Sequence, residues 1–167
     1  NISGVWADIK IGRDTLRVFN LHLRSTGITS ADRADTLSPQ IIDDTMARAK
    51  LSKVATKMMD NYRARALQAE NVANEVAQSP YPVVVCGDFN DTPVSYTYNT
   101  ILSEGLMDSF VERGRGTEYT FKGLYNLFRI DYILPHEEYF NIKEYQSFDL
   151  DYSDHKPVVV RLGMVEK

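Results

Sequence analysis

The stretch VVVCGDFNDTP, Val83–Pro93, joins an apolar run to a cluster of oxygen-bearing side chains. A short continuous apolar run bounded by turn residues is typical of a strand that is covered on both faces. The chain then turns at Gly87 and presents Asp88, Asn90 and Asp91 within a few positions. We therefore expect a buried strand with polar side chains gathered at its end, an arrangement that indicates a binding or catalytic site.

Composition limits what kind of protein this is. The chain has 167 residues, 43% of them hydrophobic, which is enough for one domain with a real core. A formal net charge of −4 gives no general attraction to nucleic acid or anionic membranes. Cys86 is the single cysteine, so an internal disulfide and a thiolate metal cluster are excluded, and we expect it to be a small core residue. No segment is apolar over a length that would span a membrane.

Periodicity predicts the other elements. Residues 4–11 alternate in polarity, which predicts a half-buried strand with Val5, Ala7, Ile9 and Ile11 on one face. Strands mixed with a long helix indicate an α/β fold built in layers. The other expected elements are a second hairpin strand at 15–23, a loop at 24–40, a helix ending near 78, strands at 82–87, 128–134 and 155–162, and a short helix at 96–106.

The long helix has an apolar stripe that we expect to face the core, because its members recur at steps of three and four. The stripe consists of Leu51, Val54, Met58, Tyr62, Ala66, Ala69, Val72 and Val76. The opposite side carries lysine and arginine. The simpler interpretation is a face exposed to solvent, and the alternative is a basic surface that binds nucleic acid.

Polar residues recur at the ends of the predicted strands. The residues concerned are His22, Asp88, Asn90, Asp131 in the middle of FRIDYIL, and Asp154 and His155 in YSDH. A buried carboxylate needs a partner, and a histidine is the natural partner for Asp131. Ordinary structural explanations also exist for single residues, such as a pair of Asp131 with Arg129 or a turn stabilised by Asp88. Taken together, these side chains supply oxygen ligands for a hard cation, a base for water and donors to phosphate oxygens, as phosphate-ester hydrolysis requires.

Four segments in this order, NLHL, VVVCGDFN, FRIDYIL and YSDHKPVVV, resemble the endonuclease/exonuclease/phosphatase superfamily, which has the deoxyribonuclease I-like fold. The segments RARALQAENVANEV and TPVSYTYNTI fit the same resemblance, and residues 31–62 match least. The resemblance implies a four-layer α/β/β/α sandwich. It also implies metal-dependent hydrolysis of phosphodiester or phosphomonoester bonds by activated water.

The resemblance gives each matching residue a role. Asp88 would be the base that activates or orients water, and Asn90 would fix that water or the metal and contact the phosphate. His155 would donate to a phosphate oxygen, and Asp131 would hold His155 protonated in the right tautomer. His22 would be a second histidine that faces the phosphate.

Metal and substrate expectations follow from the same resemblance. Asp154, Asp88 and Asn90 would bind Mg²⁺, or alternatively Mn²⁺, and Arg24 is a weaker candidate for contact with a substrate phosphate. The substrate would be a nucleic acid, a phospholipid or an inositol phosphate. The aromatic segment Tyr119–Phe128 could stack on a base, contact lipid or simply pack within its loop. The alternative function is a non-catalytic binding or scaffold module that keeps the fold.

The amino-terminal half of this family brings an early asparagine and a metal-binding glutamate, and neither is recognisable here. The chain also begins at Asn1 rather than at methionine. We therefore expect residues 1–167 to be a single unit that forms the carboxyl-terminal portion of the domain and lacks its amino-terminal strands. Its partner would be the missing half, and this fragment alone would be weakly active or inactive.

Overall fold

The structure, a computed structural model, describes residues 3–27, 44–122 and 127–165. It confirms every expected helix and strand within those ranges and adds α4 and β5. Most of the expected loop at 24–40 lies outside the described residues. The elements are β1 (Gly4–Ile11), β2 (Asp14–His22), α2 (Asp44–Ala77), β3 (Val83–Asp88), α3 (Tyr96–Leu102), α4 (Ser109–Arg113), β4 (Asp131–Pro135), β5 (Phe140–Ser147) and β6 (Val158–Met164).

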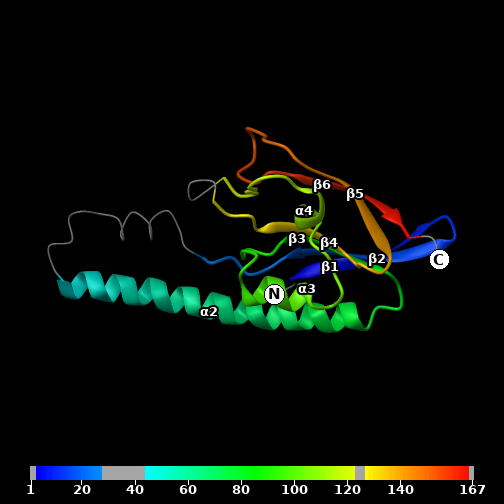
Figure 1. Cartoon of the computed structure of the whole chain (residues 1–167). Helices are drawn as coiled ribbons and strands as arrows, with labels where there is room; N and C mark the ends of the chain where they lie inside the picture. Colours follow the sequence, from blue (N-terminus) through cyan, green and yellow to red (C-terminus); the bar gives the residue numbers. More distant parts are fainter. Residues whose placement is uncertain (1–2, 28–43, 123–126, 166–167) are drawn as a thin grey trace.

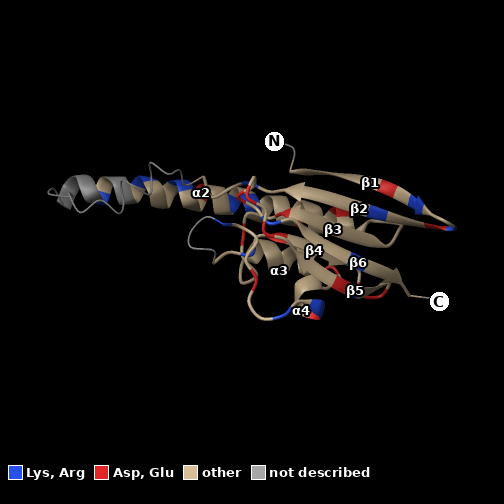
Figure 2. Cartoon of the chain, turned by 90° about the horizontal axis from the view of Figure 1, so that it is seen from above, with Lys and Arg blue, Asp and Glu red and all other residues tan. Residues whose placement is uncertain are grey.

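Four strands form one sheet in the order β1-β2-β3-β4, and Figure 2 shows them side by side. β1 and β2 are an antiparallel hairpin, whereas β2 and β3 run parallel and are connected through α2. β4 runs antiparallel to β3. The register pairs His22 with Asp88 and Asp88 with Asp131, so three polar residues lie in one row across the sheet.

The sheet, except for its edge strand β1, is covered on both faces. α2 and α3 lie along one face, and the β5–β6 hairpin lies over the other (Figure 1). Buried side chains alternate along β3, because Val83 and Val85 pack toward the helices while Val84 packs toward Phe140 of β5. The described residues thus form an α/β fold in layers, and the fourth layer of the expected sandwich stays a prediction about the whole domain.

Two expectations about burial are wrong. β1 is exposed on both faces rather than half-buried, and Val5 (65% exposed) and Trp6 (48%) illustrate this. The reason is its place at the edge of the sheet, next to β2 alone. Among the stripe residues whose side chains are described, only Ala69, Val72 and Val76 are buried, and the amino-terminal part of α2 extends beyond the sheet (Figure 1). Tyr62 is 43% exposed, whereas Arg65, outside the expected stripe, is fully buried.

None of the described helices has the length and apolar character needed to cross a lipid bilayer. The 34-residue α2 carries charged side chains along its length (Figure 2).

Candidate functional site

The end of β3 and the turn after it form the first part of the site. Gly87 has a φ of 131°, and a Cβ atom there would lie 2.0 Å from the backbone oxygen of Leu21, so the close approach of β2 requires glycine. Phe89 is fully buried and anchors the turn in the core beside Tyr132, with ring centroids 4.8 Å apart. The buried Phe89 leaves Asp88 and Asn90 on the side away from the core.

Asn90 holds the Asp88 carboxylate in place. Its backbone N–H donates to Asp88 Oδ1 at 2.7 Å, which makes the turn that the simple structural explanation of Asp88 anticipates. Its side-chain Nδ2 donates to Asp88 Oδ2 at 3.0 Å and to the carbonyl of Leu23 at 3.1 Å. Asn90 has a φ of 51°, a backbone conformation that asparagine tolerates better than most residues. Both oxygens of Asp88 therefore have fixed directions.

Asp131 and His155 form the second part of the site. His155 Nδ1 lies 2.9 Å from Asp131 Oδ2. Asp131 is fixed in turn through its backbone N–H, which donates to the hydroxyl of the fully buried Thr120 at 3.0 Å. The ring centroid of Phe121 lies 5.1 Å from that of His155. Arg129, the alternative partner considered for Asp131, instead donates to both oxygens of Asp108.

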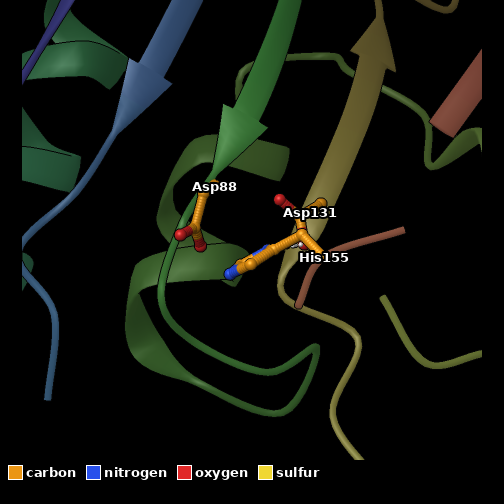
Figure 3. Close-up of side chains that lie close together, drawn as sticks. All are labelled: Asp88, Asp131 and His155. Atoms are coloured by element: carbon orange, nitrogen blue, oxygen red, sulfur yellow. Dashed lines mark hydrogen bonds and ion pairs between the residues drawn. The ribbon is translucent and has the colours of Figure 1, made fainter. Parts of the chain in front are cut away.

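The two parts meet in one cluster. Potential ligand atoms of Asp88, Asp131 and His155 all lie within 4.8 Å of one another. Figure 3 shows their side chains converging from the end of β3, the start of β4 and the segment before β6. All three are half-buried, so the cluster remains open to a small ligand.

The electrostatics of the cluster follow from burial and from mutual charge. Burial raises the pKa of Asp88 above its ordinary value, the hydrogen bond from Asn90 opposes this change, and the charge of Asp131 adds to it. Burial alone would lower the pKa of His155, but the hydrogen bond and charge of Asp131 outweigh it, so that pKa is raised. The imidazole therefore binds its second proton more tightly than an isolated histidine does.

The other residues expected in the site lie at its margin or outside it. His22 Nε2 is 3.7 Å from Asp88 Oδ2, and the His22 side chain is 78% exposed. The side chain of Arg24 turns toward α2, where its Nε donates to Asn61 Oδ1 at 2.9 Å. Asp154 is exposed and is not part of the cluster, although its carbonyl accepts a hydrogen bond from the backbone of Lys122.

The structure corrects the expected positions along the strands. Asp131 is the first residue of β4 rather than a mid-strand residue, and His155 precedes β6. Because β4 is antiparallel to β3, its amino-terminal end lies beside the carboxyl-terminal end of β3. Cys86 is half-buried, its Sγ lies 3.2 Å from the carbonyl of Phe19, and burial raises the pKa of its thiol, so nothing marks it as reactive.

Sequence reasoning missed the residues that support the cluster. Thr120 lies within the aromatic segment Tyr119–Phe128 but carries no motif of its own, and residues 123–126 of that segment lie outside the described residues. Arg65 is not one of the apolar stripe residues, but it lies three residues after Tyr62 and four before Ala69, on the same face of α2. That spacing is the signal in the sequence that could have identified it as buried. Asp91 is one of the polar residues noted after β3, but its contact with Arg65 cannot be inferred from the sequence.

Comparisons with known proteins identify the fold and the family. The chain shares its fold with a functionally unknown conserved protein from Enterococcus faecalis V583 (TM-score 0.58, 20% identity, 97% of this chain and 56% of that chain). A second match is an endonuclease/exonuclease/phosphatase from Bacteroides vulgatus (TM-score 0.53, 26% identity, 62% and 45%). A third is the mannosyl-6-phosphatase Bt3783 of Bacteroides thetaiotaomicron (TM-score 0.54, 21% identity, 95% and 55%).

This chain spans about half the length of those three proteins. No curated protein sequence matches it significantly. Its fold is the deoxyribonuclease I-like fold of these neighbours. A family model matches residues 7–155, which include every residue of the cluster. The chain therefore belongs to the endonuclease/exonuclease/phosphatase family.

Proposed function

We propose that this protein hydrolyses phosphate esters with activated water and a divalent cation. Proteins of its family are generally metal-dependent phosphoesterases, a class that includes nucleases and phosphatases. The observation that carries the proposal is the cluster of Asp88, Asp131 and His155 at the junction of β3 and β4. The cluster brings a base, a fixed carboxylate and a cationic donor within reach of one phosphate group.

The donor set fits a hard divalent cation. Asp88 offers carboxylate oxygens, and the Oδ1 atom of Asn90 accepts no hydrogen bond from any residue within 3–27, 44–122 and 127–165. Oxygen ligands of this kind suit Mg²⁺ or Mn²⁺. When bound, the cation supplies positive charge that stabilises the charge developing on the phosphoryl group. The expectation that Asp154 is also a ligand stays a prediction.

His155 acts as a donor to phosphate. Since Nδ1 is occupied by Asp131, Nε2 is the nitrogen that remains to donate a hydrogen bond to a phosphate oxygen. The raised pKa of His155 keeps a larger fraction of the ring protonated near neutral pH, so this hydrogen bond is charge-assisted. Asp131 therefore serves as the residue that orients the ring and maintains its charge.

Asp88 acts on the attacking water. The two hydrogen bonds from Asn90 aim its carboxylate, and its raised pKa makes it a stronger base than an ordinary aspartate. His22, 3.7 Å from Asp88 and largely exposed, would contact the phosphate from the solvent side. A nucleic acid, a phospholipid, an inositol phosphate or a phosphosugar each presents the phosphate ester that this arrangement would cut.

The test is hydrolysis of p-nitrophenyl phosphate and bis-p-nitrophenyl phosphate with Mg²⁺, Mn²⁺ or a chelator. We would compare the complete natural polypeptide that carries this sequence, residues 1–167 alone, and Asp88→Asn. Asp14→Asn is the matched control, because Asp14 is exposed at the opposite end of β2 from His22.

The expected result is metal-dependent hydrolysis that Asp88→Asn abolishes and Asp14→Asn leaves unchanged, with little activity in residues 1–167 alone. The preference for monoester or diester then narrows the substrate class. Metal binding without hydrolysis of either compound would point to a larger or more specific substrate. No hydrolysis and no metal binding would favour the non-catalytic scaffold function.

A further inference from the structure

Arg65 is a fully buried cation that joins three segments of the chain. It lies in α2, and its Nε donates to Asp91 Oδ2 at 3.0 Å. Its Nη1 donates to the backbone carbonyl of Arg24 at 2.7 Å. One guanidinium therefore contacts both the turn that follows β3 and the segment that follows β2.

These two segments carry the proposed catalytic groups. Asp91 directly follows Asn90, and Arg24 lies two residues beyond His22. They also contact each other beside the cluster, because the N–H of Leu23 donates to the carbonyl of Asp88 at 2.9 Å. We propose that Arg65 is a positioning residue that locks the turn after β3 against the end of β2. This inference rests on the proposed function and explains how the turn that carries Asp88 and Asn90 is held in position.

The chemistry of the contact requires arginine. A guanidinium presents several N–H donors in a rigid plane, so it can bind a carboxylate and a carbonyl that lie in different directions. A lysine has one nitrogen on a flexible stem and cannot hold both in the same geometry. Arg65 Nη2 has no hydrogen-bond partner in the part of the chain that the structure describes, and the ring of Tyr62 lies 4.6 Å from its Cζ.

Stability alone is a poor explanation for this residue. Removing two charges from water is costly, and apolar side chains of similar size often stabilise a protein as well as a buried ion pair does. The contacts instead gather on the segments next to the cluster. Gln68, one turn further along α2, accepts a hydrogen bond from the N–H of Arg24 at 2.8 Å. α2 thus holds both backbone polar groups of Arg24.

Asp91 is also held from its other side. The hydroxyl of Tyr132 donates to the backbone carbonyl of Asp91 at 2.8 Å, and Tyr132 directly follows Asp131. The turn after β3 is therefore fixed between α2 and β4. Loss of the Arg65 contact would free the side of the turn that faces β2 while the side that faces β4 stays in place.

The first experiment measures hydrogen exchange of backbone amides in the complete natural polypeptide, and it needs no substrate. In Arg65→Met we expect exchange at the amides of Leu23 and Asn90 to become at least about tenfold faster, since both donate within the locked segment. The amides that pair β3 with β4 near Val85 should keep their protection. Arg65→Lys should give an intermediate result.

Arg63→Met is the matched control. Arg63 lies on the same helix, but its side chain is 71% exposed, and its Nη1 lies 3.7 Å from Asp60 Oδ1. It should leave exchange unchanged. If Arg65→Met does not fold, Arg65→Lys and Asp91→Asn carry the same comparison. Unchanged exchange at Leu23 and Asn90 in the folded variants would overturn the proposal, as would an equal effect of Arg63→Met.

The second experiment measures kinetics on p-nitrophenyl esters, well below the thermal midpoint of each variant. Misplacement of the catalytic turn should lower kcat about 10- to 100-fold in Arg65→Met while KM changes less than about threefold, with partial recovery in Arg65→Lys. A loss of kcat that equals the fraction of unfolded protein would refute a positioning role. If the unmodified protein hydrolyses neither ester and binds no metal, the proposed function fails. Whenever neither ester is hydrolysed, the exchange experiment alone decides the role of Arg65.

Discussion

Substitution of Gly87 tests the close approach of β2 and β3 on which the site depends. A Cβ atom at this position would lie 2.0 Å from the backbone oxygen of Leu21 and 2.7 Å from its nitrogen. Leu21 is the register partner of Gly87 in the parallel pair. Both contacts are with backbone, so no side-chain movement relieves them. In Gly87→Ala the two strands must separate next to His22 and Asp88.

The expected loss of stability in Gly87→Ala has two contributions. A φ of 131° lies outside the left-handed helical region, and alanine there strains the backbone by about 1–3 kcal/mol. To reach even 3.0 Å from the Leu21 oxygen, the alanine Cβ must move away by about 1 Å, which disrupts the hydrogen bonds between β2 and β3 near their ends. Two such bonds at about 0.5–1.5 kcal/mol each add about 1–3 kcal/mol. The expected loss in free energy of unfolding is about 2–6 kcal/mol.

Gly105→Ala is the matched control for the backbone strain. Gly105 has a φ of 74°, but a Cβ atom there would meet nothing within 4 Å. We expect Gly105→Ala to cost only the strain, about 1–2 kcal/mol, and to leave hydrolysis unchanged. Urea denaturation of the complete natural polypeptide measures both losses, and ester hydrolysis reports the displacement of the site. Equal destabilisation by the two substitutions, with activity retained in Gly87→Ala, would refute the reasoning.

Three further predictions concern charged or ionisable side chains. Burial lowers the pKa of His136, whose Nδ1 accepts a hydrogen bond from the N–H of Val83 at 3.0 Å. The contribution of this neutral histidine to stability should be fully present above its unfolded pKa of about 6.5 and decrease as the pH falls from there through the lowered folded pKa. Urea titrations should show a smaller decrease in His136→Asn. Arg129→Met leaves the buried Asp108 carboxylate without its cation and should cost about 3–5 kcal/mol by urea denaturation. Asp131→Asn should lower the pKa of the histidine that it contacts, measured by NMR, and should lower kcat at least about tenfold.

Much of the fold follows from local pattern. Alternation over residues 4–11, the apolar run before Gly87 and the periodicity of α2 each identify an element of the right type, because these patterns reflect burial on one or two faces. The sequence-based predictions fail where the burial of a residue depends on distant parts of the chain. β1 has the pattern of a half-buried strand but lies at an edge, and Tyr62 has the spacing of a core residue but is 43% exposed.

The site was predictable as a set of residue types but not as an arrangement. His22 and Asp88 end their strands and Asn90 follows closely, so their position at one edge of the sheet can be inferred from sequence. Thr120 and Arg65 support the cluster through a buried hydroxyl and a buried guanidinium. Arg65 has the helical spacing of a buried residue, but neither residue has a signature that shows which groups it contacts. Such residues become visible only when their partners are known.

The direction of β4 explains the geometry of the cluster. A strand that follows a long connection can pair with β3 in either direction, and FRIDYIL contains nothing that decides between them. In a parallel β4 the start of the strand, with Asp131, would lie beside the start of β3, far from Asp88. The antiparallel pairing instead makes Asp88 and Asp131 direct partners across the sheet. Burial raises the pKa of Asp88, and the charge of Asp131 adds to this. Against the opposing effect of burial, Asp131 raises the pKa of His155. One choice of strand direction thus brings the carboxylates together and also creates the charge environment that the proposed chemistry uses.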